Sequence, residues 1–328
     1  MQYDILAIGD TTIDAFIKLK DARVHCDIND ENCQLCVRFG DKVPYESVDI
    51  VPGVGNSANA AVACARLGLK TALRVHIGTD SNGDDCLNAW KTEGVVTDLV
   101  VREADKKTNY HYVLWYEAER TILIKHEAYA YVFPELTEAP KWMYLSSLGE
   151  GTLPYHQQIA DYVSTHPQVK LAFQPGTFQI KMSKELKDIY AHSEIFFCNK
   201  EESQRILDSK ETDIKTLLAG IRALGPKIAV ITDGRNGAAV MTSSGAWSMP
   251  MYPDPAPPVS RTGAGDATAS TMTAFIALGM EPQEALLRGI INSASVVQGV
   301  GAQKCLLTKA QIEEWYAKRP ADFVATAI

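Results

Sequence analysis

Strand-like and helix-like segments alternate along nearly the whole chain, and this alternation limits the folds that it can adopt. Short apolar runs rich in β-branched and aromatic residues occur at 3–8, 71–77, 142–145, 169–173, 195–198 and 228–232. Segments with helical periodicity lie between them, at 57–67, 83–93, 153–164, 183–191 and 213–223. Alternating βα units form a parallel sheet that is covered by helices on both faces. We therefore predict an α/β fold of three layers, α/β/α, with a mainly parallel central sheet.

The ends of several predicted helices carry residues typical of helix caps. Three helical patterns stop at a glycine, which can adopt the left-handed conformation of a C-terminal cap, at Gly68, Gly94 and Gly279. The last helix begins with Thr308 and Gln311, which have the spacing of a capping box. These signals support the helical interpretation independently of the apolar periodicity.

Two segments, about 16–51 and 107–133, do not follow the βα alternation. Each contains short β-rich runs separated by polar turns. Hairpins of this kind cannot join a parallel sheet through short connections, so we expect them to form a small second sheet. Such a sheet is suited to act as a lid over a cleft. Because there is no repeat or long linker, we predict a single domain over 1–328 with this lid inserted in it.

Composition and charge exclude several classes of protein. Of the 328 residues, 46% are hydrophobic and 22% are charged, which rules out a mainly disordered chain. A net charge of −8 argues against a nucleic-acid partner, because such surfaces are basic. No apolar run approaches the ~20 residues needed to cross a membrane. The first strand contains Asp4 and follows no basic segment, unlike a signal peptide, so we expect a cytoplasmic protein without membrane contact.

The seven cysteines do not suggest a disulfide framework. Cys26, Cys33 and Cys36 lie close together beside His25, and four such ligands on a short loop would suit a zinc ion. The second half of this cluster is not a clean ligand pair, so we favour a set of reduced thiols over zinc. The other four occur singly in apolar surroundings and are interpreted as small core residues: Cys64, Cys86, Cys198 and Cys305.

The segment Thr262-Gly263-Ala264-Gly265-Asp266 precedes a helical pattern and carries the clearest chemical signal. A glycine-rich turn at the start of a helix presents free backbone N–H groups and the positive end of the helix dipole, which together suit a phosphate. Asp266 has two interpretations at this position. It can cap the helix, or it can be the base that accepts a proton from a hydroxyl attacking the bound phosphate.

Further motifs resolve this choice, because their order along the chain resembles one family. They are GDTTIDAF at 9–16, PGVGNSANAAVACARLGLKT at 52–71, HIGTDSNGDDCLNAWKTEGV at 76–95, CNKEES at 198–203, TDGRNGAAV at 232–240 and TGAGDA at 262–267. Together they resemble the ribokinase/PfkB family of carbohydrate and nucleoside kinases over about 300 residues. The resemblance implies a ribokinase-like fold and ATP-dependent phosphorylation of a hydroxyl group.

The resemblance also implies roles for particular residues. Asp266 would be the base, and the turn Gly263, Ala264 and Gly265 would be the anion hole. Substrate contacts are implied for Asp14, Gly55, Asn56 and Asn59. Nucleotide contacts are implied for Asn199, Thr232, Gly234 and Gly237. Glu202 would hold Mg²⁺ through water, which suits an ion that keeps several of its waters.

The sequence departs from the family pattern around the substrate and ion sites. Ser260 stands where an aspartate is usual, and Cys305 stands where a small hydroxyl residue is common, so dependence on K⁺ does not carry over. Val54 replaces the first glycine of a pair, and Asn56 replaces the basic residue of ribose kinases. Gln174 stands where an acid is frequent. The identity of the substrate therefore cannot be transferred from one relative.

Three functions remain at this stage. The first is a kinase for a small ribose- or fructose-like sugar. The second is a nucleoside kinase, for which aromatic residues of the lid would supply a wall for the base: Tyr110, Tyr112, Trp115 and Tyr116. The third is a non-catalytic sensor of a nucleotide or sugar, which would have no need of Asp266. A Rossmann dehydrogenase is excluded because no G-x-G-x-x-G follows the first strand. We also expect a homodimer through the lid, since pairing would cover its edges and apolar face.

Overall fold

A nine-stranded sheet forms the centre of the protein, and the computed structural model describes residues 2–26, 33–117 and 119–328. Six neighbouring strands run parallel in the order β6 (Thr71–Arg74), β1 (Ile5–Ile8), β11 (Trp142–Leu145), β12 (Lys170–Phe173), β13 (Ser193–Asn199) and β14 (Ile228–Thr232). Three antiparallel strands complete one edge: β15 (Ala238–Met241), β16 (Ala246–Met249) and β17 (Thr326–Ala327). The mainly parallel central sheet predicted from the sequence is confirmed.

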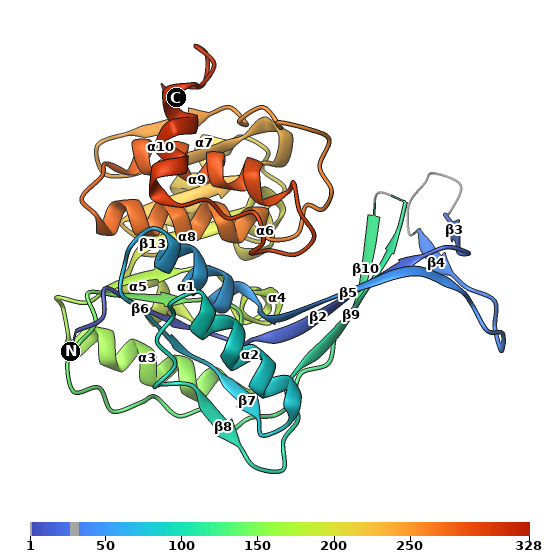
Figure 1. Cartoon of the computed structure of the whole chain (residues 1–328). Coiled ribbons are helices and arrows are strands. Elements are labelled where there is room, and N and C mark those ends of the chain that lie inside the picture. The colour runs from blue at the N-terminus through green and yellow to red at the C-terminus, as the bar shows by residue number, and fades with distance from the viewer. Residues whose placement is uncertain (1, 27–32, 118) are drawn as a thin grey trace.

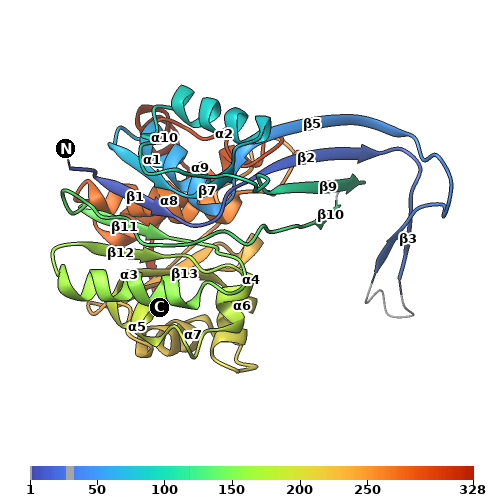
Figure 2. The ribbon, with the colours of Figure 1, turned by 90° about the horizontal axis from the view of Figure 1, so that it is seen from below.

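Helices cover both faces of this sheet (Figures 1 and 2). One face packs against α1 (Asn56–Arg66), α2 (Ser81–Thr92), α8 (Ala264–Ala277), α9 (Pro282–Val296) and α10 (Lys309–Ala317). The other packs against α3 (Leu153–Thr165), α4 (Thr177–Lys181), α5 (Lys187–His192), α6 (Lys200–Ile206) and α7 (Ile214–Ala223). Alternate residues of β1 enter the two cores, Ile5 and Ala7 on one side and Leu6 and Ile8 on the other. The burial of β1 on both faces explains its continuous apolar sequence.

The local signals read from the sequence are largely confirmed. Gly68, Gly94 and Gly279 have positive φ angles of 90°, 75° and 92°, and Thr308 caps α10 in a capping box with Gln311. Two segments differ from the prediction. The run at 71–77 is divided between β6 and β7 (His76–Gly78), which pairs instead with β8 (Val101–Glu103). The helix expected over 183–191 begins only at Lys187, because residues 183–186 form turns closed by i−3 hydrogen bonds.

A second sheet projects from the body of the molecule (Figures 1 and 2). Its strand order is β10 (Glu119–Leu123), β9 (Tyr110–Tyr116), β2 (Thr12–Leu19) and β5 (Tyr45–Val54), and we refer to these four strands as the small sheet. β2 and β9 are parallel, whereas the two outer pairs are antiparallel. A short hairpin of β3 (Arg23–His25) and β4 (Gln34–Cys36) lies at its far end.

The two faces of the small sheet differ in character. Asp14 pairs with His111, so these two side chains share one face. Ala15 pairs with both Ile50 and Tyr112 on the opposite face. That opposite face carries large apolar side chains with exposed fractions of 43–59%: Val48, Ile50, Tyr112 and Leu123.

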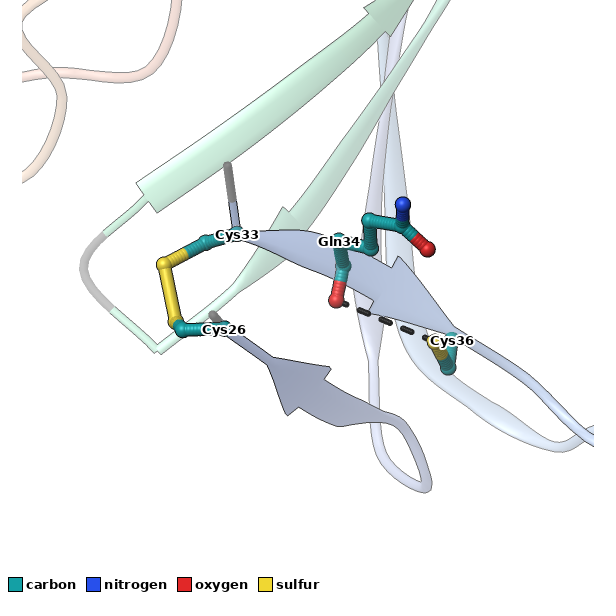
Figure 3. Close-up of a disulfide and its surroundings, with 4 residues drawn as sticks. All are labelled: Cys26, Cys33, Gln34 and Cys36. Atoms are coloured by element: carbon teal, nitrogen blue, oxygen red, sulfur yellow. Dashed lines mark hydrogen bonds between the residues drawn. A yellow bond between two sulfur atoms is a disulfide. The ribbon is translucent and has the colours of Figure 1, made fainter. Parts of the chain in front are cut away.

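The cysteines near the tip of the hairpin correct one expectation from the sequence. Cys26 and Cys33 form a disulfide, whereas Cys36 is a free, exposed thiol whose Sγ lies 3.8 Å from the carbonyl oxygen of Gln34 (Figure 3). The favoured set of reduced thiols is therefore wrong for this pair. The bonded sulfurs are also not available as the thiolates that a zinc site would need. Cys64, Cys86 and Cys198 are buried as expected, and Cys305 is only half-buried.

Over residues 2–26, 33–117 and 119–328, no helix combines the length and the apolar character that crossing a bilayer requires.

Candidate functional site

The carboxyl ends of neighbouring parallel strands line a polar cavity of about 290 Å³. Ser147 follows β11 and Gln174 follows β12, while Asn199 and Thr232 are the last residues of β13 and β14. Open α/β sheets bind ligands at this edge, because the loops that follow the strands converge there. Asn56, Gly265 and Thr268 line the same cavity from α1 and α8.

The N-terminus of α8 faces this cavity. Gly263 is the residue before the helix and has a φ of 82°, a left-handed conformation that favours glycine. A Cβ atom at Gly263 would lie 2.4 Å from the Cβ of Ala302, so the close packing of these two segments also excludes a side chain. Ala264 and Gly265 open the first turn, whose backbone N–H groups have no partners within the helix. The turn predicted to hold an anion is therefore placed where a phosphate can reach it.

A second cavity, of about 190 Å³, continues from the first, and the two share Thr232, Gly265 and Thr268. Gly234 and Gly237 line it together with the charged residues Asp254 and Arg261. Its apolar wall is formed by Ala238, Met251, Ala264, Ile290, Ala294 and Val297. An apolar cleft that opens into a polar one suits a ligand with a flat ring at one end and charged groups at the other.

The turn after β14 requires two glycines for different reasons. Gly237 has a φ of 89°, and a Cβ there would lie 2.0 Å from the carbonyl oxygen of Met249. Gly234 has a φ of 53°, and no heavy atom lies within 4 Å of the position that a Cβ would take there. Gly237 therefore fixes the shape of the turn, and Gly234 leaves room beside the second cavity.

Three side-chain amides hold the carboxylate of Asp266 in the first turn of α8. Oδ1 accepts hydrogen bonds from Asn56 Nδ2 at 2.9 Å and from Gln174 Nε2 at 3.0 Å. Oδ2 accepts one from Asn59 Nδ2 at 2.7 Å. The structure thus brings together Asp266, predicted as the base, and Asn56 and Asn59, predicted as substrate contacts, and it adds Gln174, which the sequence indicated only as a departure from a family pattern.

Both ends of the Asn59 side chain are used within the protein. Its Oδ1 accepts a hydrogen bond from Gln303 Nε2 at 3.0 Å, which leaves Nδ2 to face Asp266. Asn59 is 4% exposed, so it orients the carboxylate rather than offering a free donor and acceptor to a ligand. Gly55 precedes α1 with a φ of 108°, and a Cβ there would lie 2.9 Å from the carbonyl oxygen of Asp10.

Burial raises the pKa of Asp266, and the negative charge of Asp14 raises it further. The hydrogen bonds from Asn59, Gln174 and Asn56 act in the opposite direction, because they stabilise the ionised form. The net shift is upward. A carboxylate with a raised pKa is a better proton acceptor near neutral pH than an exposed one.

Asn199 and Glu202 form a capping box at the start of α6. Asn199 Oδ1 accepts a hydrogen bond from the backbone N–H of Glu202, and Glu202 Oε2 accepts one from the backbone N–H of Asn199, each at 2.8 Å. Both residues also line the polar cavity. Burial raises the pKa of Glu202. The N-x-x-E pattern therefore has a structural role in the helix start, and the cap occupies one of the two oxygens of Glu202.

Asp14 lies on the face of the small sheet that it shares with His111. Its Oδ1 is buried without a hydrogen-bond partner and lies 3.5 Å from His111 Nδ1. The negative charge of Asp14 acts on Asp266 and raises the pKa of that carboxyl group.

A second acid, Asp10, lies in the same region and was not singled out in the sequence. Its Oδ1 accepts a hydrogen bond from the hydroxyl of Tyr131, and its Oδ2 lies 3.5 Å from His126 Nδ1. The rings of His126 and His111 meet edge to face at 5.5 Å. The Gly-Asp dipeptide after the first strand was the one signal in the sequence that pointed to Asp10. Tyr131 and His126 belong to a later segment, and the sequence did not show that this segment folds against Asp10.

Comparison with known proteins identifies the family. Residues 19–309 match the model of the pfkB family of carbohydrate kinases. The chain belongs to the PfkB family. It is 27% identical to a ribokinase of Bacillus subtilis over 286 residues, covering 84% of this chain and 92% of that protein. It is 25% identical to a nucleoside kinase of Methanothermobacter thermautotrophicus over 227 residues, covering 68% and 71% of the two chains.

The fold is also that of solved members of the family. The structure of Arabidopsis thaliana ribokinase complexed with ribose and ATP superposes with a TM-score of 0.79 at 18% identity, covering 96% of this chain and 98% of that one. This likeness confirms the ribokinase-like fold with its smaller sheet. As a PfkB member, the protein is a phosphotransferase with a hydroxyl group as acceptor, and it acts on a sugar or a nucleoside.

Proposed function

We propose that this PfkB protein transfers the γ-phosphoryl group of ATP to a hydroxyl of a small ribose- or fructose-like sugar. The observation that carries this proposal is the position of Asp266, which lies in the first turn of α8 beside the two connected cavities and close to Asp14. A base, an anion-binding helix start and an acceptor-side acid are the groups that in-line phosphoryl transfer requires.

The residues of the two cavities fit a nucleotide and Mg²⁺. The apolar wall around Ile290 and Val297 suits the base, and the start of α8 at Gly263–Gly265 suits the phosphates. Glu202 lines the polar cavity with a carboxylate, the kind of hard oxygen group that holds Mg²⁺ through water. Bound Mg²⁺ supplies positive charge for the phosphates, and Asn199, Thr232, Gly234 and Gly237 complete the nucleotide site.

The protein's own groups then account for each part of the transfer. Asp14 holds the acceptor, and Asp266 accepts the proton of the attacking hydroxyl. The acceptor oxygen forms a bond to the γ-phosphorus, the bond between that phosphorus and ADP breaks, and the backbone N–H groups at Gly263–Gly265 stabilise the developing charge. Closure of the small sheet over the acceptor excludes water as a competing acceptor.

A nucleoside acceptor is the second candidate, and Trp115 is the observation that favours it. Trp115 pairs with Lys18 and therefore lies on the same face of the small sheet as Asp14. Tyr110, Tyr112 and Tyr116 alternate with it and lie on the opposite face. The aromatic wall expected from the sequence is thus reduced to one residue on this side, and we therefore place the sugar first.

We also propose that the protein forms a homodimer through the small sheet. The exposed face that carries Val48, Ile50, Tyr112 and Leu123 would be covered by the same face of a second copy. Sedimentation at micromolar concentration tests this, with Ile50→Glu expected to give a monomer. A monomeric wild-type protein would remove the dimer and leave the proposed chemistry intact.

A panel of acceptors tests the proposed function. Purified protein is incubated with Mg²⁺, ATP labelled in the γ-phosphate and, one at a time, free pentoses, hexoses and nucleosides, and transfer of label is measured. We expect a sugar to be the best acceptor. A nucleoside preferred over every sugar would select the second candidate. Tight nucleotide binding with no transfer to any acceptor would contradict the proposal and favour a sensor.

A further inference from the structure

The hydrogen-bonding capacity of the Asp266 carboxylate is almost fully used by the protein. An ionised carboxylate has about four lone-pair positions for hydrogen bonds. Asn56 and Gln174 occupy two on Oδ1, and Asn59 occupies one on Oδ2. One position on Oδ2 remains for the hydroxyl of the acceptor.

Two of the three neighbours are oriented as donors by their other hydrogen bonds. The Oδ1 of Asn59 already accepts a bond from Gln303, whose Nε2 also donates to the carbonyl oxygen of Gly53 at 2.9 Å. The Oε1 of Gln174 accepts a bond from the hydroxyl of Tyr144 at 2.5 Å. Burial keeps the pKa of Tyr144 well above its usual value, so this hydroxyl retains its proton and can donate. The amide –NH₂ groups of Asn59 and Gln174 are thereby directed at Asp266.

Protonation of Asp266 would weaken these three hydrogen bonds. The proton could occupy the remaining position on Oδ2, but a neutral carboxyl group is a weaker acceptor than a carboxylate. The three amide donors therefore favour the ionised form, which is the form that can accept a proton.

We propose that Gln174 is a positioning residue for phosphoryl transfer, which, with Asn56 and Asn59, keeps Asp266 ionised and reserves its Oδ2 for the acceptor hydroxyl. This inference rests on the proposed role of Asp266 as the base. Gln174 belongs to the loop after β12 and lines the polar cavity, and its amide donates to the carboxylate of Asp266 at the start of α8.

The charges around Asp266 make this contribution important. Asp14 of β2 raises the pKa of Asp266, and the charge of Asp266 in turn raises the pKa of Glu202 of α6. Tyr144 of β11 is also close, and its hydroxyl stays neutral. Burial and the charge of Asp14 favour protonation of Asp266, and the amide donors oppose them.

Two substitutions at Gln174 separate hydrogen bonding from charge. Gln174→Leu removes one donor to the carboxylate, so the pKa of Asp266 should rise by about one unit, since a hydrogen bond to a charged group corresponds to a shift of about that size. Gln174→Glu places a second carboxyl group against Oδ1, and the pair should then hold a proton to still higher pH. In both variants the acidic limb of the kcat–pH profile should move to higher pH, and the displacement should be larger for Gln174→Glu.

The experiment measures kcat, KM and nucleotide affinity between pH 5 and 9.5 with ATP and the best acceptor. For Gln174→Leu we expect about a tenfold loss of kcat on the acidic limb, recovery at high pH and little change in nucleotide affinity by calorimetry. Asn56→Asp, at a half-buried position, provides a second variant that places an acid against the same Oδ1 and should shift the limb in the same direction. Gln157→Glu, on the exposed surface of α3, adds the same charge elsewhere and should leave the profile unchanged.

The outcomes separate this inference from the proposed function. If Asp266→Asn abolishes transfer but the folded Gln174 and Asn56 variants keep the wild-type pH profile, the role of Gln174 is wrong and the base assignment stands. A pH-independent loss of kcat in all these variants would also contradict the inference. If Asp266→Asn retains normal turnover, the proposed base itself is wrong.

Discussion

Replacement of Glu202 tests whether this residue acts beyond its role as a helix cap. Its Oε2 accepts the backbone N–H of Asn199 at 2.8 Å, and its side chain lines the polar cavity. Glu202→Gln keeps an oxygen for the cap and removes the charge. Glu202→Ala removes both. Comparison of the two variants therefore separates the contribution of Glu202 to stability, as a helix cap, from its proposed contribution to Mg²⁺ binding.

The structure gives the expected size of the stability effects. Loss of the hydrogen bond to Asn199 in Glu202→Ala should lower the free energy of unfolding by about 1 kcal/mol. Burial raises the pKa of Glu202 in the folded state, so the folded protein binds this proton more tightly than the unfolded chain. Ionisation of Glu202 therefore costs stability as the pH rises through its unfolded pKa. Glu202→Gln avoids that cost and should be as stable as the wild type, or more stable, at pH 7.

Unlike the loss of stability, a weaker response to Mg²⁺ is expected in both variants. An outer-sphere carboxylate that holds water on a metal typically contributes 10–100-fold in affinity or activity. Both variants should therefore need about ten times more free Mg²⁺, or more, for half-maximal rate at saturating ATP and acceptor. The assay is the initial rate as a function of free Mg²⁺, alongside urea unfolding of the same samples.

Glu201→Gln is the matched control, because Glu201 is the exposed neighbour of Glu202 and lies outside the cavity lining. It should change neither the Mg²⁺ dependence nor the stability. A wild-type Mg²⁺ dependence in Glu202→Gln, with a loss of stability only in Glu202→Ala, would show that Glu202 is solely a cap and would refute its assignment to the ion.

Other parts of the site lead to further predictions. Asp14→Asn should raise the KM of the acceptor and leave the nucleotide affinity measured by calorimetry unchanged. A change in nucleotide affinity alone would show that Asp14 contacts the nucleotide and not the acceptor. Gly237→Ala should lower the free energy of unfolding in urea by about 3 kcal/mol or more, because the new Cβ would collide with the Met249 carbonyl at a φ of 89°. Gly68→Ala is the control, because Gly68 has a similar φ of 90° with open space around it, and it should cost only about 1 kcal/mol. Equal costs for the two would contradict the steric argument. Alkylation of the denatured, non-reduced protein should label the five free cysteines but not Cys26 or Cys33, and seven labels by mass spectrometry would exclude the disulfide.

The central fold could be predicted from the sequence because its signals are local. The strands at 142–145 and 228–232 are buried on both faces, so their apolar runs alone give their positions. Helix ends at Gly68 and Thr308 likewise depend on a few neighbouring residues. The division of 71–77 into two strands was not predictable in this way, since β7 leaves the central sheet to pair with β8, a distant segment.

The site was predicted as separate motifs, but its hydrogen bonds were not. Asn59 has the residue type of a substrate contact, yet its partners are Asp266 and Gln303, which are more than 200 residues away in the chain. The sequence indicated Gln174 only as a departure from a family pattern, and its hydrogen bond to Asp266 joins residues that are 92 positions apart in the chain. Similarly, the sequence favoured reduced thiols over zinc for Cys26 and Cys33 and did not predict their disulfide, because that bond depends on how the hairpin places them.

The most direct test of the account is turnover by Asp266→Asn, measured with ATP and the best acceptor of the panel. The amide keeps the size of the side chain and can still lie at the start of α8, but it cannot accept the proton of the attacking hydroxyl. We predict a loss of about 10²–10⁴-fold in kcat. Nucleotide affinity should be equal or slightly higher, because a negative charge near the γ-phosphate is removed. Near-normal turnover in a correctly folded Asp266→Asn protein would contradict the account, because the carboxylate would then be only a helix-terminal residue.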